Sequence, residues 1–139
     1  MCLLTIQSEP LVAEEDIICY KVYFKSKNWY ESPVMGDIVT ELNQVLKTNL
    51  QKSTLDGEVY EGYHSFKYKE SADTLYPNNE KVCVKCIIPK GSLYYKGIHD
   101  FIFREDDGYC SDTIILCAEE PIGEKKPNIF KRIINKLFN

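Results

Sequence analysis

Residues 81–96, KVCVKCIIPKGSLYYK, decide the fold. Between 81 and 88 apolar side chains recur at every second position, which is the side-chain period of a β-strand. Pro89, Lys90 and Gly91 then form a turn signal, and residues 93–96 read as a strand that returns from it. Two strands with no helix between them indicate a largely antiparallel sheet.

The chain on either side of this stretch carries more strand-like runs. They are rich in β-branched and aromatic residues, and they occur at 17–24, 58–67 and 109–117. Gly62 interrupts the second run, which predicts a bulge or a close approach of another segment at that point. Residues 97–108 are polar and contain the turn signal Asp106-Asp107-Gly108, so they predict a loop.

Helical signals are fewer and shorter. Residues 69–76 predict a short helix that Pro77 ends. Residues 37–50 carry apolar residues at helical spacing, but their asparagine and β-branched content leaves helix and extended structure both open. Apolar residues also recur at helical spacing in the last stretch, 128–138.

Together these elements predict a single α+β domain with a largely antiparallel sheet, one or two short helices and a C-terminal amphipathic helix. We expect the α+β domain to span residues 1–120, a linker to span 121–127 and the basic amphipathic helix to span 128–139. The length of 139 residues is that of one domain. The sequence contains no glycine-rich phosphate loop of either common type.

Composition places the chain among ordinary globular proteins. Hydrophobic residues make up 44% and charged residues 27%. The first residues contain no basic stretch and turn acidic early, unlike a signal peptide, which predicts a cytoplasmic protein (the host cytoplasm, if a phage encodes it). The net charge of −4 argues against a nucleic-acid partner bound by charge alone.

The six cysteines predict free thiols in a reducing compartment. Cys83 and Cys86 form a CxxC pair, but on a strand, residues three apart point to opposite faces. Two thiols on opposite faces cannot share a zinc ion, and no second pair completes the four ligands, so we predict no metal site.

Charge is concentrated at the C-terminal end. Residues 124–139 carry five basic residues against one acidic residue, a local charge of +4, so the other 123 residues carry −8. In the predicted helix, apolar and basic residues occupy opposite sides, and the residues that would meet a partner or a membrane are Ile129, Phe130, Lys131, Arg132, Ile133, Lys136 and Leu137. This helix would dock on its own sheet, on a partner protein or on an anionic membrane surface.

Four strings carry a resemblance to a known group: IICYKVYF at 17–24, EGYHSFK at 61–67, VKCIIPKGSLYYKG at 84–97 and YCSDTIIL at 109–116. They resemble a group of small uncharacterised proteins of gut bacteria and their phages. This resemblance implies an accessory protein encoded by a phage or a bacterium, without a defined activity.

More distantly, the chain resembles the ADP-ribosyltransferase fold. Lys21, the segment 64–66, the turn 89–91 and the strand 114–116 follow one another in the order of that fold's motifs. The resemblance implies an NAD cofactor. Thr113 precedes the last of these strands, where the family carries its catalytic glutamate, and Lys21 stands where the family carries arginine or histidine.

If that resemblance holds, His64 and Ser65 line an NAD cleft and the catalytic candidates are His64, Ser65 and Thr113. A threonine hydroxyl cannot supply the negative charge that stabilises an oxocarbenium-like centre, so the active site would be degenerate. Read from the residues alone, His64 is either an acid or base at neutral pH or a half-buried histidine bonded to a backbone carbonyl. The pair His99-Asp100 reads as a solvated pair in a polar loop.

Ten tyrosines suit either a binding surface or half-exposed sheet faces. We therefore predict a non-catalytic binding or accessory protein without a cofactor, which meets a protein partner through an aromatic surface formed by Tyr63, His64, Phe66 and Tyr95. One alternative is the NAD-binding enzyme with a degenerate active site. A second is an adaptor at a membrane surface, tethered by residues 128–139.

Overall fold

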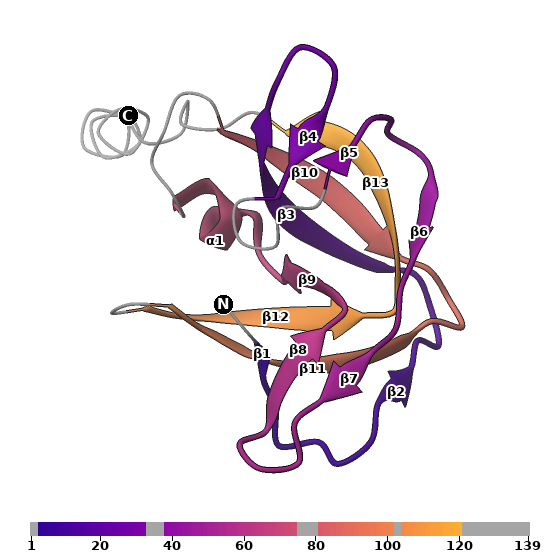
Figure 1. The fold of residues 1–139 in the computed structure, drawn as a ribbon, viewed down its shortest axis with the longest axis vertical. Helices are drawn as coiled ribbons and strands as arrows, with labels where there is room; N and C mark the ends of the chain where they lie inside the picture. Colours follow the sequence, from indigo (N-terminus) through magenta and orange to yellow (C-terminus); the bar gives the residue numbers. More distant parts are fainter. Residues whose placement is uncertain (1–2, 33–37, 75–80, 102–103, 121–139) are drawn as a thin grey trace, which may run out of the picture.

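The computed structural model describes residues 3–32, 38–74, 81–101 and 104–120, which form one sheet of thirteen strands and one short helix (Figure 1). The long strands are β3 (Ile17–Lys25), β10 (Lys81–Ile88), β11 (Leu93–Phe101), β12 (Arg104–Ser111) and β13 (Thr113–Glu120). The short strands are β1 (Leu3–Leu4), β2 (Leu11–Val12), β4 (Tyr30–Glu31), β5 (Ile38–Val39), β6 (Val45–Lys47), β7 (Gln51–Lys52), β8 (Glu58–Glu61) and β9 (Tyr63–Phe66). The helix is α1 (Lys69–Thr74).

The three strands β3, β10 and β13 form the longest continuous part of the sheet and lie together in the upper half of Figure 1. β10 pairs with β3 over its whole length and with β13 on its other side, both antiparallel. The strands predicted at 17–24 and 81–88 are confirmed by β3 and β10. Burial alternates along only part of each strand, because the stretch Lys21–Tyr23 of β3 and the pair Cys83 and Val84 of β10 are buried on both faces.

The hairpin of β11 and β12 crosses the lower half of Figure 1, and its existence corrects two predictions. Residues 97–108 were expected as a loop, but they lie largely in these two strands, with Gly97 directly opposite Gly108. The predicted single strand at 109–117 is wrong as well, because the chain turns at Asp112 between β12 and β13. Pairing across the hairpin, rather than local composition, decides the structure of this polar stretch.

The sheet closes on itself because each of two short segments forms two consecutive strands that pair with different neighbours. Residues 58–66 form β8, which pairs with β1 and β7, and then β9, which pairs with β12 and β3. Residues 45–52 likewise form β6, which pairs with β13, and β7, which pairs with β8. β1, β11, β12 and the segment 58–66 therefore make a small closed ring, and β3, β10, β13 and both segments make a second one.

Gly62 separates β8 from β9, and the prediction that it occupies a special place is confirmed. Its φ of 141° lies in a region that only glycine adopts without strain. A methyl group there would lie 2.5 Å from Cys110 Sγ and 2.8 Å from Leu50 Cδ1. The glycine thus allows the segment to bend from one ring into the other.

The predicted α+β class is wrong. Of the described residues, 60% lie in strands and 5% in helix, so the protein is a mostly antiparallel β protein.

Residues 37–50, left open between helix and extended structure, contain β5 and β6 rather than a helix, and Asn43 between them has a φ of 65°. The β-branched Val39, Thr40 and Val45 favour strands over helix. The helix expected over 69–76 is confirmed over Lys69–Thr74 by α1, and residues 75–76 fall outside the described residues. The linker 121–127 and the helix 128–139, with Ile129, Phe130, Lys131, Arg132, Ile133, Lys136 and Leu137, fall outside the described residues.

Three clusters of buried side chains fill the fold. The main core lies on the inner face of the long strands and includes Cys19, Tyr23, Val84, Cys86, Ile88, Ile114 and Leu116. The ring core lies inside the small ring and consists of Leu3, Val59, Tyr95 and Cys110. The helix-side core lies on the outer face of β3 and β10, where α1 covers it, and consists of Val22, Phe66, Ala72 and Cys83.

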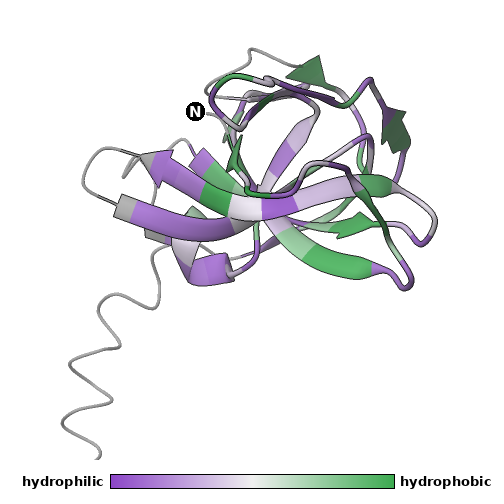
Figure 2. Cartoon of the chain, turned by 90° about the horizontal axis from the view of Figure 1, so that it is seen from below, coloured by the Kyte–Doolittle hydropathy of each residue, from purple (hydrophilic) through white to green (hydrophobic). Residues whose placement is uncertain are grey.

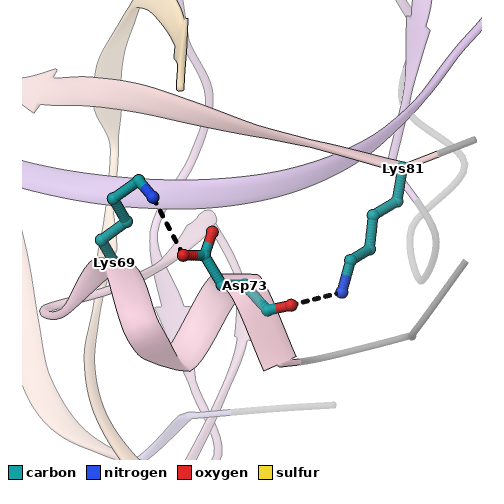
Figure 3. A network of polar contacts seen from close by, with 3 residues as sticks. All are labelled: Lys69, Asp73 and Lys81. Carbon is teal, nitrogen blue, oxygen red and sulfur yellow. Dashed lines mark hydrogen bonds and ion pairs between the residues drawn. The ribbon is translucent and has the colours of Figure 1, made fainter. Parts of the chain in front are cut away.

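One lysine contact stabilises α1 internally, and a second joins the helix to β10. Lys69 Nζ lies 2.9 Å from Asp73 Oδ2 within the helix, and Lys81 Nζ on β10 donates to the backbone carbonyl of Asp73 at 2.7 Å (Figure 3). All three side chains are largely buried. The Lys81 bond satisfies a carbonyl in the last turn, where a short helix leaves its acceptors unpaired.

Hydropathy varies along the hairpin of β11 and β12, whose far end is hydrophilic, as the purple strand ends in Figure 2 show. Asp100, Glu105 and Asp107 lie there with exposed or partly exposed side chains. Among the residues that the structure describes, none lies in a helix of the length and apolar character needed to cross a membrane.

Candidate functional site

Both histidines of the chain lie next to each other in the interior, with ring centroids 5.6 Å apart. His64 Nε2 donates to the carbonyl oxygen of Val59 at 2.9 Å, and His99 Nε2 donates to that of Ser65 at 2.8 Å. Because a carbonyl oxygen only accepts, each ring carries its proton on Nε2. The reading of His64 as a half-buried histidine bonded to a backbone carbonyl is confirmed. The reading of His99 as a solvated residue is wrong, because its side chain is 0% exposed.

The environment keeps both histidines neutral. Burial lowers the pKa of His64 and of His99 to about 4, and the hydrogen bonds to carbonyl oxygens oppose this change only in part. The ammonium group of Lys21, which donates to the carbonyl of His64 at 2.6 Å, lowers both pKa values further. A general acid or base at neutral pH needs a pKa near 7, so neither imidazole is prepared for that role.

Thiols surround the histidines without forming an accessible nucleophile. Cys110 Sγ lies 3.9 Å from His64 Nδ1 and 3.8 Å from the carbonyl oxygen of Glu61, in the ring core. The hydrogen bond from Cys86 lowers the pKa of Cys19, but both thiols are fully buried. A buried thiol is inert towards a substrate that does not reach it, so none of these three cysteines is placed as a nucleophile.

The four residues predicted to form an aromatic surface do not share one. Phe66 and Tyr95 are buried, at 4% and 6% exposure, in the helix-side core and the ring core. Tyr63 packs against the main core and is partly buried, and His64 faces the ring core. The segment 58–66 lies between two rings, so neighbouring side chains on it point into different interiors.

The three catalytic candidates also lie apart. His64 and Ser65 are neighbours on β9 and face opposite sides of the strand, and Ser65 is 1% exposed. Thr113 begins β13 and donates its hydroxyl to Asp112 Oδ1 at 2.9 Å, at a groove that neither of the other two lines. Lys21 is buried and donates to a carbonyl inside the sheet. The structure therefore brings no two of these side chains together at an open cleft.

The CxxC pair behaves as the strand geometry predicts. Cys83 belongs to the helix-side core and Cys86 to the main core, on opposite faces of β10. Burial raises the pKa of Cys83 to about 12, so this thiol keeps its proton. Within residues 3–32, 38–74, 81–101 and 104–120, no three His, Cys, Asp or Glu side chains are grouped so that they could hold a metal ion.

A row of aliphatic side chains crosses the outer face of the sheet, at right angles to the strands. Ile18 on β3 lies opposite Ile87 on β10, Ile87 lies opposite Ile115 on β13, and Ile115 lies opposite Val45 on β6. Their chain neighbours Cys19, Cys86 and Ile114 point into the main core, which places these four side chains outside. Ile18 is 51% exposed and Val45 is 56% exposed. We call these four residues the aliphatic row.

A groove of about 490 Å³ continues from one end of this row to the turn at Pro89–Gly91. Val45 and Ile115 of the row form part of its lining, and the polar part of the lining comes from Lys47, Thr48, Lys90, Ser92, Asp112 and Thr113. We call this depression the turn groove. It is the one place where a residue predicted for catalysis, Thr113, meets the outer surface of the sheet.

Sequence reasoning missed the aliphatic row, although a signal for it was present. The strings IICY, KCII and TIIL each carry adjacent apolar residues, so an apolar side chain stands on both faces of the strand. Only the register between strands shows that the outward-facing members line up. A strand that is apolar on both faces is usually covered on both faces. In the part of the chain that the structure describes, Ile18 and Val45 of this row remain exposed.

Comparison with known proteins finds no match to a family model, to a curated protein or to a solved structure. The function must therefore be argued from the fold and from the surfaces described above.

Proposed function

We propose that this protein works by binding another protein, without catalysing a reaction, and that the aliphatic row is the surface that makes the contact. The observation that carries the proposal is the alignment of four outward-facing β-branched side chains in register across β3, β10, β13 and β6. Ile18 and Val45 at the two ends are exposed, and Ile87 and Ile115 between them are partly buried. Exposed apolar residues scattered singly are normal, but a contiguous apolar patch indicates an interaction site.

The row stands on a rigid support. Ile18, Ile87 and Ile115 belong to three of the five long strands, and their chain neighbours are among the most buried residues of the main core. Because β-branched side chains on a strand have few rotamers, they lose little conformational entropy when a partner covers them. This preorganisation favours binding over a structural role, since exposed aliphatic side chains add little to stability.

The interior supports a role without catalysis. The two histidines in the centre of the fold are buried and neutral, and their hydrogen bonds go to backbone carbonyls. The five cysteines in the described part of the chain are free, as expected for the cytoplasmic setting that we propose. The origin in a phage or a gut bacterium stays a prediction of the sequence resemblance.

The test compares proteins captured from the native cell by the full chain and by two variants. The first variant, Ile87→Thr with Ile115→Thr, keeps the branched β-carbon and places hydroxyl groups in the middle of the row. The control, Ile6→Thr with Leu55→Thr, changes apolar side chains that are 104% and 96% exposed elsewhere on the surface. We expect the row variant to lose a captured protein that the control retains. Equal capture by both variants would contradict the proposal.

A further inference from the structure

Lysines stand on both sides of the aliphatic row. Lys85 precedes Ile87 by two residues on the same face of β10, opposite Tyr20 and Ala118 of the neighbouring strands. Lys47 follows Val45 by two residues on the same face of β6, and Lys90 lines the turn groove beside it. Three lysines thus flank an apolar strip, on a protein whose net charge is −4. The carboxylate of Asp16 lies at the same turn, where it accepts a hydrogen bond from the backbone N–H of Lys90 at 2.8 Å.

The two lysines of the turn groove, Lys47 and Lys90, are exposed, and neither forms an ion pair with another residue in the described part of the chain. The groove contains one carboxylate, that of Asp112. It accepts hydrogen bonds from the backbone N–H of Leu93 at 3.1 Å and from the Thr113 hydroxyl at 2.9 Å. One oxygen of the Asp112 carboxylate is therefore bonded within its own turn, while the ammonium groups of Lys47 and Lys90 form no ion pair among the described residues.

We propose that the aliphatic row and the turn groove together bind a linear segment of a second protein that carries both aliphatic and acidic side chains. This inference rests on the proposed function and specifies the partner. The aliphatic side chains of the segment cover the row, and its Asp or Glu carboxylates meet Lys47 and Lys90. Opposite charges at the rim of an apolar contact set the choice of partner and the rate of association.

The dimensions of the row fit a short segment. Four neighbouring strands span three strand spacings, or about 14 Å. An extended segment covers that distance with about four residues and a helix with about nine. A second copy of this chain fits less well, because two identical rows placed face to face would bring lysines of both copies together.

The experiment selects binders from a library of displayed random peptides of about twelve residues, a length that covers the row in either conformation, using the immobilised full chain. An enriched peptide is then synthesised, and its affinity is measured by fluorescence anisotropy at low and high salt. We expect enrichment of sequences that combine Val, Ile or Leu with Asp or Glu. Their affinity should fall as salt rises, because the flanking charges are exposed.

Three variants assign the result. Lys47→Glu with Lys90→Glu reverses the charge of the groove and should weaken the peptide about tenfold or more. The control, Lys67→Glu with Lys96→Glu, makes the same change at two exposed lysines that line a different depression, and it should leave the affinity unchanged. The row variant Ile87→Thr with Ile115→Thr should abolish binding.

The outcomes separate this inference from the proposed function. If the wild-type chain enriches no peptide beyond those that the row variant also retains, the inference of a linear segment fails. The proposed function then stands if the capture experiment still finds a protein that the row variant loses, and it fails if that experiment finds none. If the peptides need the row but are neutral or basic, or bind the charge-reversed variant equally well, only the acidic partner is overturned. A dimer in sedimentation experiments that the row variant dissociates would make a second copy the occupant and would also overturn it.

Discussion

Gly62 offers the sharpest test of the fold, because it is the point where residues 58–66 pass from one ring to the other. The perturbation is Gly62→Ala, which adds a single carbon. At a φ of 141° that carbon would lie 2.5 Å from Cys110 Sγ, 2.8 Å from Leu50 Cδ1 and 3.2 Å from the carbonyl oxygen of Ser111. The thiol and the leucine belong to or pack against the ring core, so neither moves freely.

Two costs combine in this variant. Holding a residue other than glycine in this region of φ costs about 1–3 kcal/mol. Overpacking a well-filled interior costs about 1–3 kcal/mol more. We therefore expect Gly62→Ala to lower the free energy of unfolding by about 4 kcal/mol, a large part of the ~5–15 kcal/mol typical of a domain.

Gly57→Ala is the matched control. Gly57 also has a positive φ, 74°, but its added carbon would meet one atom within 4 Å, the Thr5 carbonyl oxygen at 3.0 Å. Left-handed conformation costs an alanine about 1–2 kcal/mol, so the control should lose about that much. Urea denaturation followed by far-UV circular dichroism measures both. Equal losses in the two variants would refute the argument that the ring core closes around Gly62.

Three further outcomes follow from the buried groups. The pKa of His64 and of His99 is about 4 in the folded chain against 6.5 when exposed, so the unfolded chain takes up protons first as the pH falls. Stability should therefore decline from pH 6.5 towards pH 4, by about 2 kcal/mol per histidine at pH 5, and His64→Gln should remove about half of this dependence in denaturation curves at pH 7 and pH 5. Thiol counting under denaturing, non-reducing conditions should find all six cysteines free, and a lower count would contradict this. The hydrogen bond to Glu119 raises the pKa of Tyr30 to about 12, so absorbance titration should show one late phenol that Glu119→Gln shifts to lower pH.

The sequence predicted the parts of the fold that local pattern controls. Alternating apolar residues and β-branched side chains predict the strands β3 and β10. The proline that follows α1 predicts that this helix is short. The hairpin of β11 and β12 could not be found in this way, since His99, Asp100, Asp106 and Asp107 are typical of a loop. Eight residue pairs between the two strands override that composition.

In the candidate site, too, some features follow from the local sequence and others do not. Of the two interpretations of His64, the histidine bonded to a backbone carbonyl is confirmed. Tyr95 and Phe66 were assigned to a surface, and their burial follows from a closure of the sheet that no local pattern encodes. The aliphatic row depends on the register of four strands, and its members Ile18 and Ile115 lie far apart in the sequence.

The outer face of β3 and β10 carries apolar residues along much of its length, and the two halves of that face have different covers. Over the half that includes Val22 and Cys83, α1 supplies Ala72, which is 0% exposed, and the apolar side chains are buried. Over the half that includes Ile18 and Ile87, no described residue plays this part, and Ile18 remains 51% exposed. On this face, the apolar side chains at one end of the two strands are thus covered by α1, and those at the other end have no such cover among the described residues. Because burying a side chain of this size is worth about 1.5–3 kcal/mol, the open half has the larger gain still to make, and a partner is what would provide it.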